Sequence, residues 1–220
     1  GPLDRIAQRA DHFRMRPDVH ILVLAAGASS RMRGRDKLLQ PIKGKPILRV
    51  VSDLALATGA RVYVALPPAA EARHRVLADS AVMVVAVPDA ALGMSRSIVR
   101  GVAAIAAAES GPEDGVMILP ADMPGFSAKA LADLISRFRA EPELIWRGGT
   151  TDGTAGHPAI FPRDLWAELQ AITGDEGGRS ILKRNQDRVR VVPLPGRMAV
   201  IDLDTQEDWA AFLGRPLPSA

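Results

Sequence analysis

The chain has 220 residues, of which 47% are hydrophobic and 24% charged, and this length and composition fit one globular α/β domain with a sizeable core. The sequence contains no cysteine, which excludes disulfides and cysteine-ligated zinc sites and agrees with the reducing cytoplasm. The net charge is only +3 and aromatic residues make up 4%, so the chain lacks the basic, aromatic-rich stripe of a nucleic-acid-binding protein.

The first 18 residues carry no signal for a secreted or membrane protein. Gly1-Pro2-Leu3 lacks an initiator methionine and resembles the remnant of a cleaved tag. Residues 4–18 alternate charges without the apolar core of a signal peptide, and no apolar run approaches the roughly 20 residues that cross a bilayer. We interpret residues 1–18 as a tag remnant followed by a linker or short helix, and expect a cytoplasmic protein with no membrane partner.

Apolar runs rich in Val, Ile and Leu alternate with helical patterns through the first 140 residues. Unbroken apolar runs are typical of strands that are buried on both faces. The predicted strands are His20–Leu24, Arg61–Leu66, Ala81–Val87 and Gly115–Leu119, and the predicted helices are Ile47–Thr58, Ala69–Ala78, Ser95–Ala108 and Ser127–Ala140. This alternation predicts a Rossmann-like α/β fold with a mainly parallel, mixed sheet sandwiched by helices.

The pattern is less regular in the second part of the chain. The predicted strands there are Leu144–Arg147, His157–Phe161, Val189–Leu194 and Met198–Ile201, and the predicted helices are Arg163–Ala171, Gly178–Arg184 and Thr205–Leu213. We find no repeat and no internal boundary. Residues 19–214 are therefore assigned to one domain, and residues 215–220 to a frayed tail.

The loops after the apolar runs are the candidate sites, because ligands of an open parallel sheet bind beyond the carboxyl ends of its strands. These loops are Ala25–Asp36, Pro67–Pro68, Pro88–Ser97 and Pro120–Phe126. In the first loop small residues precede cations, so backbone N–H groups can approach an anion while Arg31 and Lys37 neutralise a triphosphate. The Walker A ending and the Gly-x-Gly-x-x-Gly pattern are both absent, which argues against a P-loop ATPase and a dinucleotide-dependent dehydrogenase.

Asp122 stands between Pro120 and Pro124, which restrict the backbone on both sides of it. Magnesium binds one or two carboxylates together with substrate phosphates and water, and Asp122 is placed for that role. Taken alone, the residue serves equally well as a turn or N-cap aspartate. Ser95 and Ser97 similarly either cap a helix or bind a ligand at its N-terminus.

Several segments resemble, in the same order along the chain, the nucleotidyltransferases with a glycosyltransferase-A-like fold. Leu24–Lys37 is similar to the signature L-A-A-G-x-S-x-R-M-G-x-x-K, except that Arg33 stands where glycine is common. Gly93–Ile98 resembles the G-M-x-x-S-L/I element of the molybdenum cofactor cytidylyltransferase branch. Further matches are Ile118–Pro124 around Asp122, Gly156–Phe161 (G-H-P-x-x-F), Gly174–Leu182 (G-D-x-G-A-R-x-L-L) and Ile201–Trp209 (D-I/V-D-T-x-E-D).

This resemblance implies a magnesium-dependent enzyme that transfers CMP from CTP to the phosphate of a molybdopterin-type cofactor and releases pyrophosphate. It implies Arg31, Lys37 and Asp122 as catalytic residues, with Asp122 holding magnesium and Asp202 as a further candidate ligand. His157 and Arg179 become candidates for binding the acceptor, beside structural roles for both. The residues implied for nucleotide binding are Leu24, Ala25, Ala26, Gly27, Ala28, Ser29, Arg31, Lys37, Pro67, Gly93, Met94, Ser95 and Ser97.

CTP is expected rather than GTP, because the guanylyl branch carries a glycine pair where this chain has Ala25-Ala26. Two methyl groups there would crowd a purine, while Met94 and Ser95 would suit cytosine. The implied partners are CTP, a molybdopterin-type cofactor and a client molybdoenzyme or its chaperone. Three alternatives stay open: a transferase acting on a sugar or polyol phosphate, a guanylyl-transferring relative, and a catalytically silent module that binds nucleotide or cofactor.

Overall fold

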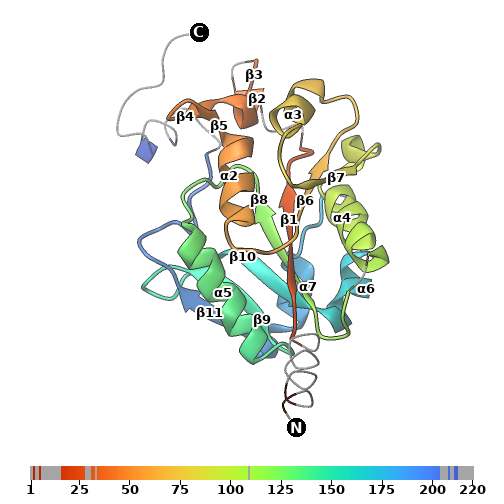
Figure 1. The fold of residues 1–220 in the computed structure, drawn as a ribbon, viewed down its shortest axis with the longest axis vertical. Coiled ribbons are helices and arrows are strands. Elements are labelled where there is room, and N and C mark those ends of the chain that lie inside the picture. The colour runs from red at the N-terminus through yellow and green to blue at the C-terminus, as the bar shows by residue number, and fades with distance from the viewer. Residues whose placement is uncertain are drawn as a thin grey trace.

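The computed structural model describes residues 16–27, 31–32, 34–108, 110–203, 208 and 211–212, together with Pro2 and Arg5. Ala28 and Ser29 lie outside these residues, and most of the N-terminal segment 4–18 and of the expected helix Thr205–Leu213 does so as well. Within the described residues, one sheet runs through the molecule with helices on both sides (Figure 1). No helix in this part of the chain is long and apolar enough to cross a membrane.

The central sheet has seven strands. In order across the sheet they are β11 (Val189–Pro193), β9 (Ile145–Gly149), β10 (Ala155–Pro162), β8 (Gly115–Pro120), β1 (Val19–Leu24), β6 (Val62–Leu66) and β7 (Met83–Ala86). β10 runs antiparallel to both of its neighbours, and the other adjacent pairs are parallel. The mixed, mainly parallel sheet predicted from the sequence is confirmed.

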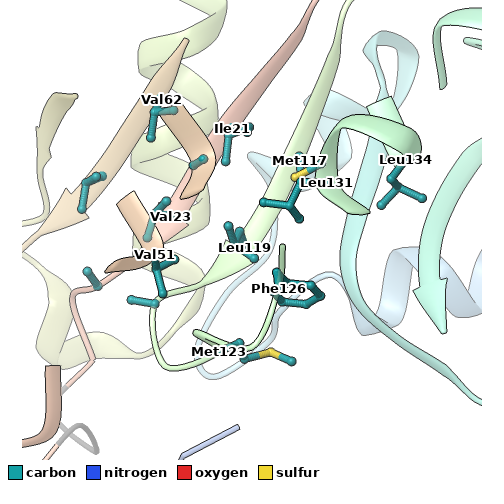
Figure 2. Packing of buried hydrophobic residues seen from close by; sticks show 14 of the residues in the cluster. Ile21, Val23, Val51, Val62, Met117, Leu119, Met123, Phe126, Leu131 and Leu134 are labelled. Carbon is teal, nitrogen blue, oxygen red and sulfur yellow. The ribbon is translucent and has the colours of Figure 1, made fainter. Parts of the chain in front are cut away.

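Two core clusters form because successive residues of a strand point to opposite faces of the sheet. Ile21 and Val23 of β1 pack in a cluster with α2 (Ile47–Leu56) and α5 (Ala128–Ala140), part of which Figure 2 shows. Leu22 packs in the other cluster with α4 (Ser95–Ala107), α6 (Trp166–Leu169) and α7 (Arg179–Arg184). Helices thus cover both faces and leave the strand ends for loops.

The remaining elements are short. They are the hairpins β2 (Arg31–Met32) with β3 (Arg35–Asp36) and β4 (Pro41–Ile42) with β5 (Lys45–Pro46), the helix α3 (Glu71–Val76), and the 3-10 turns η2 (Lys37–Leu39), η3 (Ala90–Leu92), η4 (Arg163–Leu165) and η5 (Gln186–Arg188). The sequence analysis did not predict either hairpin. Both are too short to produce an alternating hydrophobic pattern.

Two predictions about strands are wrong. The run Ala81–Val87 does form β7, but β7 is the outermost strand, and Met83 and Val84 are 40% and 43% exposed. Apolar composition therefore indicated a strand correctly and its burial incorrectly. Met198–Ile201 was expected to be a strand, and residues 197–200 instead form turns, with the N–H of Val200 donating to the carbonyl of Arg197.

Candidate active site

The loops that follow β1 and β8 lie side by side, because these two strands are adjacent and parallel. The N–H of Ala121, just after β8, donates to the carbonyl of Leu24 at the end of β1 over 3.1 Å. The N–H of Ala25 likewise donates to the carbonyl of Ala65 in β6 over 3.1 Å. The sequence-predicted loops thus meet at the carboxyl edge of the sheet, where ligands of this architecture bind.

Lys37 and Asp122 come together at this edge. The Nζ of Lys37 lies 2.9 Å from Oδ2 of Asp122, and Lys37 is only 3% exposed. Asp36 fixes the start of η2, because its side chain accepts a hydrogen bond from the N–H of Leu38 over 3.1 Å. Lys37 is the first residue of that turn. The cap at Asp36 therefore fixes the backbone from which the Lys37 side chain extends to the carboxylate of Asp122.

The loop that carries Asp122 is anchored in the core. The side chains of Met123 and Phe126 are 2% and 3% exposed and belong to the same cluster as β1, as Figure 2 shows. The side chain of Asp122 itself keeps 21% of its surface exposed. The carboxylate therefore stands at the rim of a rigid scaffold, open to a ligand.

The backbone of a second acidic residue, Asp202, lies near this point. The N–H of Leu203 donates to the backbone carbonyl of Asp122 over 3.0 Å, and exposed Asp202 directly precedes Leu203. Two carboxylates that leave room for phosphate oxygens suit a magnesium-type cation. No group of three or more His, Cys, Asp or Glu residues in the described part of the chain is arranged as a metal site.

The small residues of the first loop are anchored by their methyl groups. Ala25 is 1% exposed and packs in the cluster with α2, whereas Ala26 is 5% exposed and packs in the cluster with α4. These methyl groups face the core, so the argument that they crowd a purine is not supported. Gly27 is exposed, and the backbone of Arg31 lies opposite that of Asp36 in the β2–β3 hairpin. Pro67 follows β6, and its carbonyl accepts from Nε2 of His74 over 2.9 Å.

The segment that opens α4 is joined to the segment that precedes α7. The hydroxyl and N–H of Ser95 both donate to the carbonyl of Gly174, over 2.6 and 3.2 Å. Ser95 is fully buried, and the N-cap position is Met94, so neither expected role of Ser95, as cap or as nucleotide ligand, describes its hydroxyl. Ser97 is also buried, at 5% exposure, while Met94 is 54% exposed.

Gly93 makes this junction possible. Its φ is +122°, and a Cβ on it would lie 2.2 Å from the carbonyl oxygen of Gly174. Any side chain at this position would force the two segments apart. The motifs that the sequence analysis assigned separately to nucleotide and acceptor are therefore parts of one structural unit.

His157 and Arg179 lie near a cation that the sequence analysis did not single out. The surrounding chain displaces water from the His157 ring and so lowers its pKa, the charge of Arg147 lowers that pKa further, and Asp122 raises it. Partial burial and then the charge of Arg179 lower the pKa of Arg147, which still remains protonated. Nε of Arg147 donates to the carbonyl of Gly156 over 3.2 Å.

Two positive charges that act on one another at a surface favour an anion between or beside them. The lowered pKa of His157 disfavours its charged form, so Arg147 and exposed Arg179 are the cations of this group. The signal for Arg147 in the sequence was a single arginine that ends an otherwise apolar strand prediction, directly before Gly148-Gly149.

Comparison with known proteins identifies the family of the chain. Residues 21–189 match the family described as the MobA-like NTP transferase domain. The chain belongs to this family. A relative from Nostoc sp., named probable molybdenum cofactor guanylyltransferase, is 26% identical over 197 residues, which cover 88% of this chain and 89% of the relative.

Solved structures of other proteins share the fold. The crystal structure of Rv0371c from Mycobacterium tuberculosis H37Rv matches with a TM-score of 0.75 at 27% identity, covering 90% of this chain and 99% of Rv0371c. Rv0371c in complex with manganese matches with a TM-score of 0.72 at 25% identity, over 90% of this chain and 98% of that chain. This MobA-like chain is therefore a nucleotidyltransferase.

Proposed function

We propose that this enzyme transfers a nucleoside monophosphate from a triphosphate to the phosphate of a molybdopterin-type cofactor. A phosphate oxygen of the acceptor attacks the α-phosphorus, and the bond from that phosphorus to the bridging oxygen breaks. Pyrophosphate leaves with the electron pair. The acceptor phosphate is already an anion near neutral pH, so no general base is assigned. The observation that carries the proposal is the Lys37–Asp122 pair beside the first loop.

The chain's own residues would act by positioning and charge. The backbone of the first loop, from Leu24 to Gly27, would face the polyphosphate, with Lys37 and Arg31 neutralising it. Asp122, with Asp202 beside it, would hold magnesium, which when bound neutralises phosphate charge and orients the triphosphate. The manganese complex of Rv0371c supports a divalent cation in this family.

The acceptor would bind on the side of Arg147 and Arg179. Both carry a positive charge, and His157 lies close enough to respond electrostatically to Arg147 and to Asp122. The anionic acceptor would therefore approach the nucleotide from the β9–β10 side. The name of the relative from Nostoc sp. supports a molybdenum cofactor as acceptor. A client molybdoenzyme or its chaperone would then receive the product.

CTP is our first candidate donor, because Gly93–Ile98 resembles the cytidylyltransferase element. With the methyl groups of Ala25 and Ala26 in the core and the Ser95 hydroxyl bound to Gly174, exposed Met94 is the side chain of this group best suited to contact a base. GTP is the second candidate, favoured by the name of the guanylyltransferase relative.

A matrix of the four nucleoside triphosphates against candidate acceptors, scored by pyrophosphate release, tests the proposal. We expect metal-dependent release with a molybdopterin-type acceptor. In competition at equal concentration, CTP should be preferred over GTP by about 10- to 200-fold, the range typical of pocket discrimination. Equal use of both, or preference for GTP, would overturn the choice of base alone. Pyrophosphate release with a sugar or polyol phosphate would identify that compound as the acceptor in place of the molybdopterin-type cofactor. No release with any acceptor would favour a catalytically silent module.

A further inference from the structure

Arg73 of α3 is an almost fully buried cation without a role in the chemistry so far. The residue is 5% exposed, and its guanidinium contacts both ends of the first loop. At the start of the loop, Nη1 donates to the carbonyl of Ala25 over 2.5 Å and Nη2 to the carbonyl of Gly27 over 3.5 Å. At the end of the loop, Nε and Nη2 donate to the two carboxylate oxygens of Asp36 over 2.7 and 3.2 Å.

This arrangement uses the planar fork of arginine. The pairing with Asp36 is bidentate, which fixes orientation as well as distance, while the remaining donor reaches the backbone. A lysine has one charged nitrogen and cannot span these partners in a fixed geometry. Removing water from a cation is unfavourable unless its donors are satisfied, so the loop ends must stay where they are for Arg73 to stay buried.

Asp36 passes this constraint on to Lys37. The same carboxylate that pairs with Arg73 accepts the hydrogen bond from the N–H of Leu38 that begins η2. Lys37 is the first residue of η2, and its side chain reaches Asp122. Arg73 therefore acts on Lys37 through Asp36, and it does not itself contact the ammonium group that we propose to face the triphosphate.

Arg73 also orients the backbone at the start of the loop. In a planar trans peptide, the carbonyl of one residue and the N–H of the next point in opposite directions. Because the carbonyl of Ala25 points to Arg73, the N–H of Ala26 points away from it. A loop that turns its carbonyl groups toward a buried cation presents N–H groups on the other side, as an anion requires.

We propose that Arg73 is a positioning residue that holds the two described ends of the first loop, Ala25–Gly27 and Asp36, in the arrangement that accepts a triphosphate, before any nucleotide binds. Arg73 does so by joining the carbonyl groups of Ala25 and Gly27 to the carboxylate of Asp36. The consequence for catalysis rests on the proposed function of this loop. The effect of Arg73 on the loop in the free protein does not depend on the proposed function.

Arg49 provides a matched control. It lies in α2, and its guanidinium also binds two carboxylates and one carbonyl: Asp53 over 2.9 Å, Asp79 over 2.6 Å and the carbonyl of Val76 over 3.1 Å. None of these partners belongs to the first loop. Val76 ends α3, the helix that carries Arg73, so Arg49→Met removes contacts to that helix and to its neighbour Asp79 but none to the first loop itself.

The experiment compares Arg73→Met, Arg73→Lys and Arg49→Met in the full chain. Amide hydrogen exchange is followed without nucleotide in peptides covering residues 22–39 and, for reference, α5. We expect exchange in residues 22–39 to accelerate about tenfold or more in both Arg73 variants, since hydrogen bonds to charged groups are lost, and to stay unchanged in Arg49→Met. Exchange in α5 should be unchanged in all three.

Steady-state kinetics then test the catalytic consequence. The Arg73 variants should lose about 100-fold in kcat/KM for the triphosphate, the loss typical of a misplaced positioning contact, with the acceptor KM unchanged. Arg73→Lys serves if Arg73→Met fails to fold. Loop exchange equal to that of the parent protein, or acceleration spread evenly over residues 22–39 and α5, would overturn the role of Arg73. If loop exchange accelerates in the Arg73 variants but the parent chain itself transfers no nucleotide, the proposed function is refuted and the role of Arg73 in the loop stands.

Discussion

The ammonium of Lys37 and the carboxylate of Asp122 lie 2.9 Å apart, although 84 other residues separate them in the sequence. The sequence analysis predicted that Lys37 binds the triphosphate and that Asp122 binds a metal. In the free protein each is the counter-ion of the other, which satisfies a lysine that is 3% exposed. A metal-bound triphosphate carries both signs of charge, so it can replace each partner in turn: phosphate oxygens for the carboxylate at Lys37, and metal for the ammonium at Asp122.

Asp122→Asn should abolish turnover without unfolding the chain. The variant keeps the shape of the side chain and loses the charge that a divalent cation requires. Because the side chain is partly exposed and Met123 and Phe126 anchor the loop, the fold should survive. Pyrophosphate release as a function of magnesium and manganese concentration measures the first effect, and circular dichroism the second. Unchanged metal-dependent activity would refute the assignment, and loss of the fold would indicate a structural role.

Lys37→Met and Arg31→Ala should each weaken transition-state stabilisation by about 2–4 kcal/mol. Methionine retains most of the buried length of Lys37, so its effect reports on the charge. The measurement is kcat/KM for the triphosphate at saturating acceptor. Arg35→Ala is the control, because Arg35 belongs to the same hairpin and no motif requires it. The assignment of the loop fails if the control variant is as impaired as the other two.

Arg147→Ala and Arg179→Ala should raise the acceptor KM by about 10- to 100-fold, since each removes a charged hydrogen-bond donor from an anion. The triphosphate KM should change little. Arg184→Ala is matched to Arg179→Ala, because Arg184 ends the same helix and pairs with Glu168 at 3.6 Å. An acceptor KM that moves equally in all three variants would show a general effect of surface charge rather than a binding site.

The sequence predicted those features that depend on local pattern. Apolar runs located the parallel strands, and the rule that ligands bind beyond their carboxyl ends brought Lys37 and Asp122 into one region. The family resemblance supplied the roles that we propose for them. Features that depend on tertiary contacts were missed. Arg73 lies in an unremarkable polar helix, and only the folded chain brings its guanidinium to Ala25 and Asp36.

The same limit explains the errors. The sequence position of Ser95 suggested a cap or a ligand, but its hydroxyl donates a hydrogen bond to the carbonyl of Gly174, 79 residues away. Composition alone gives no indication that β7 is at an edge, because an edge strand and a central strand can be equally apolar. The inward direction of the Ala25 and Ala26 methyl groups likewise depends on which helices cover the two faces of the sheet.

Gly93→Ala should separate the α4 segment from the segment before α7. The backbone at φ +122° disfavours any side chain, and the added Cβ would lie 2.2 Å from the carbonyl oxygen of Gly174. We expect a loss of about 1–3 kcal/mol in the free energy of unfolding. Urea unfolding measures this loss. Gly153→Ala is the control, because Gly153 has φ +89° but nothing within 4 Å of its Cβ position. Equal losses in both variants would assign the effect to backbone strain and remove the case for a close contact.

The carboxyl group of Asp114 should make the stability of the fold depend on pH. Burial alone would raise the pKa of its carboxyl, but hydrogen bonds from His20 and from the N–H groups of Asp18 and Gly111 outweigh it, so the pKa is lowered. These contacts are 2.9, 3.0 and 2.8 Å long.

The folded chain therefore releases the Asp114 proton more readily than the unfolded chain. Between the two pKa values the unfolded state binds more protons, so the free energy of unfolding rises with pH in that window. The contribution is fully present above the unfolded pKa of about 3.9 and is lost as pH falls through the lowered folded value. Asp114→Asn should remove this contribution, lowering stability near neutral pH by about 1–3 kcal/mol and flattening the acid side of the stability curve. Urea unfolding from acid to neutral pH measures both, with Asp133→Asn, on the exposed face of α5, as the control. An acid slope identical in Asp114→Asn and the parent chain would contradict the assignment.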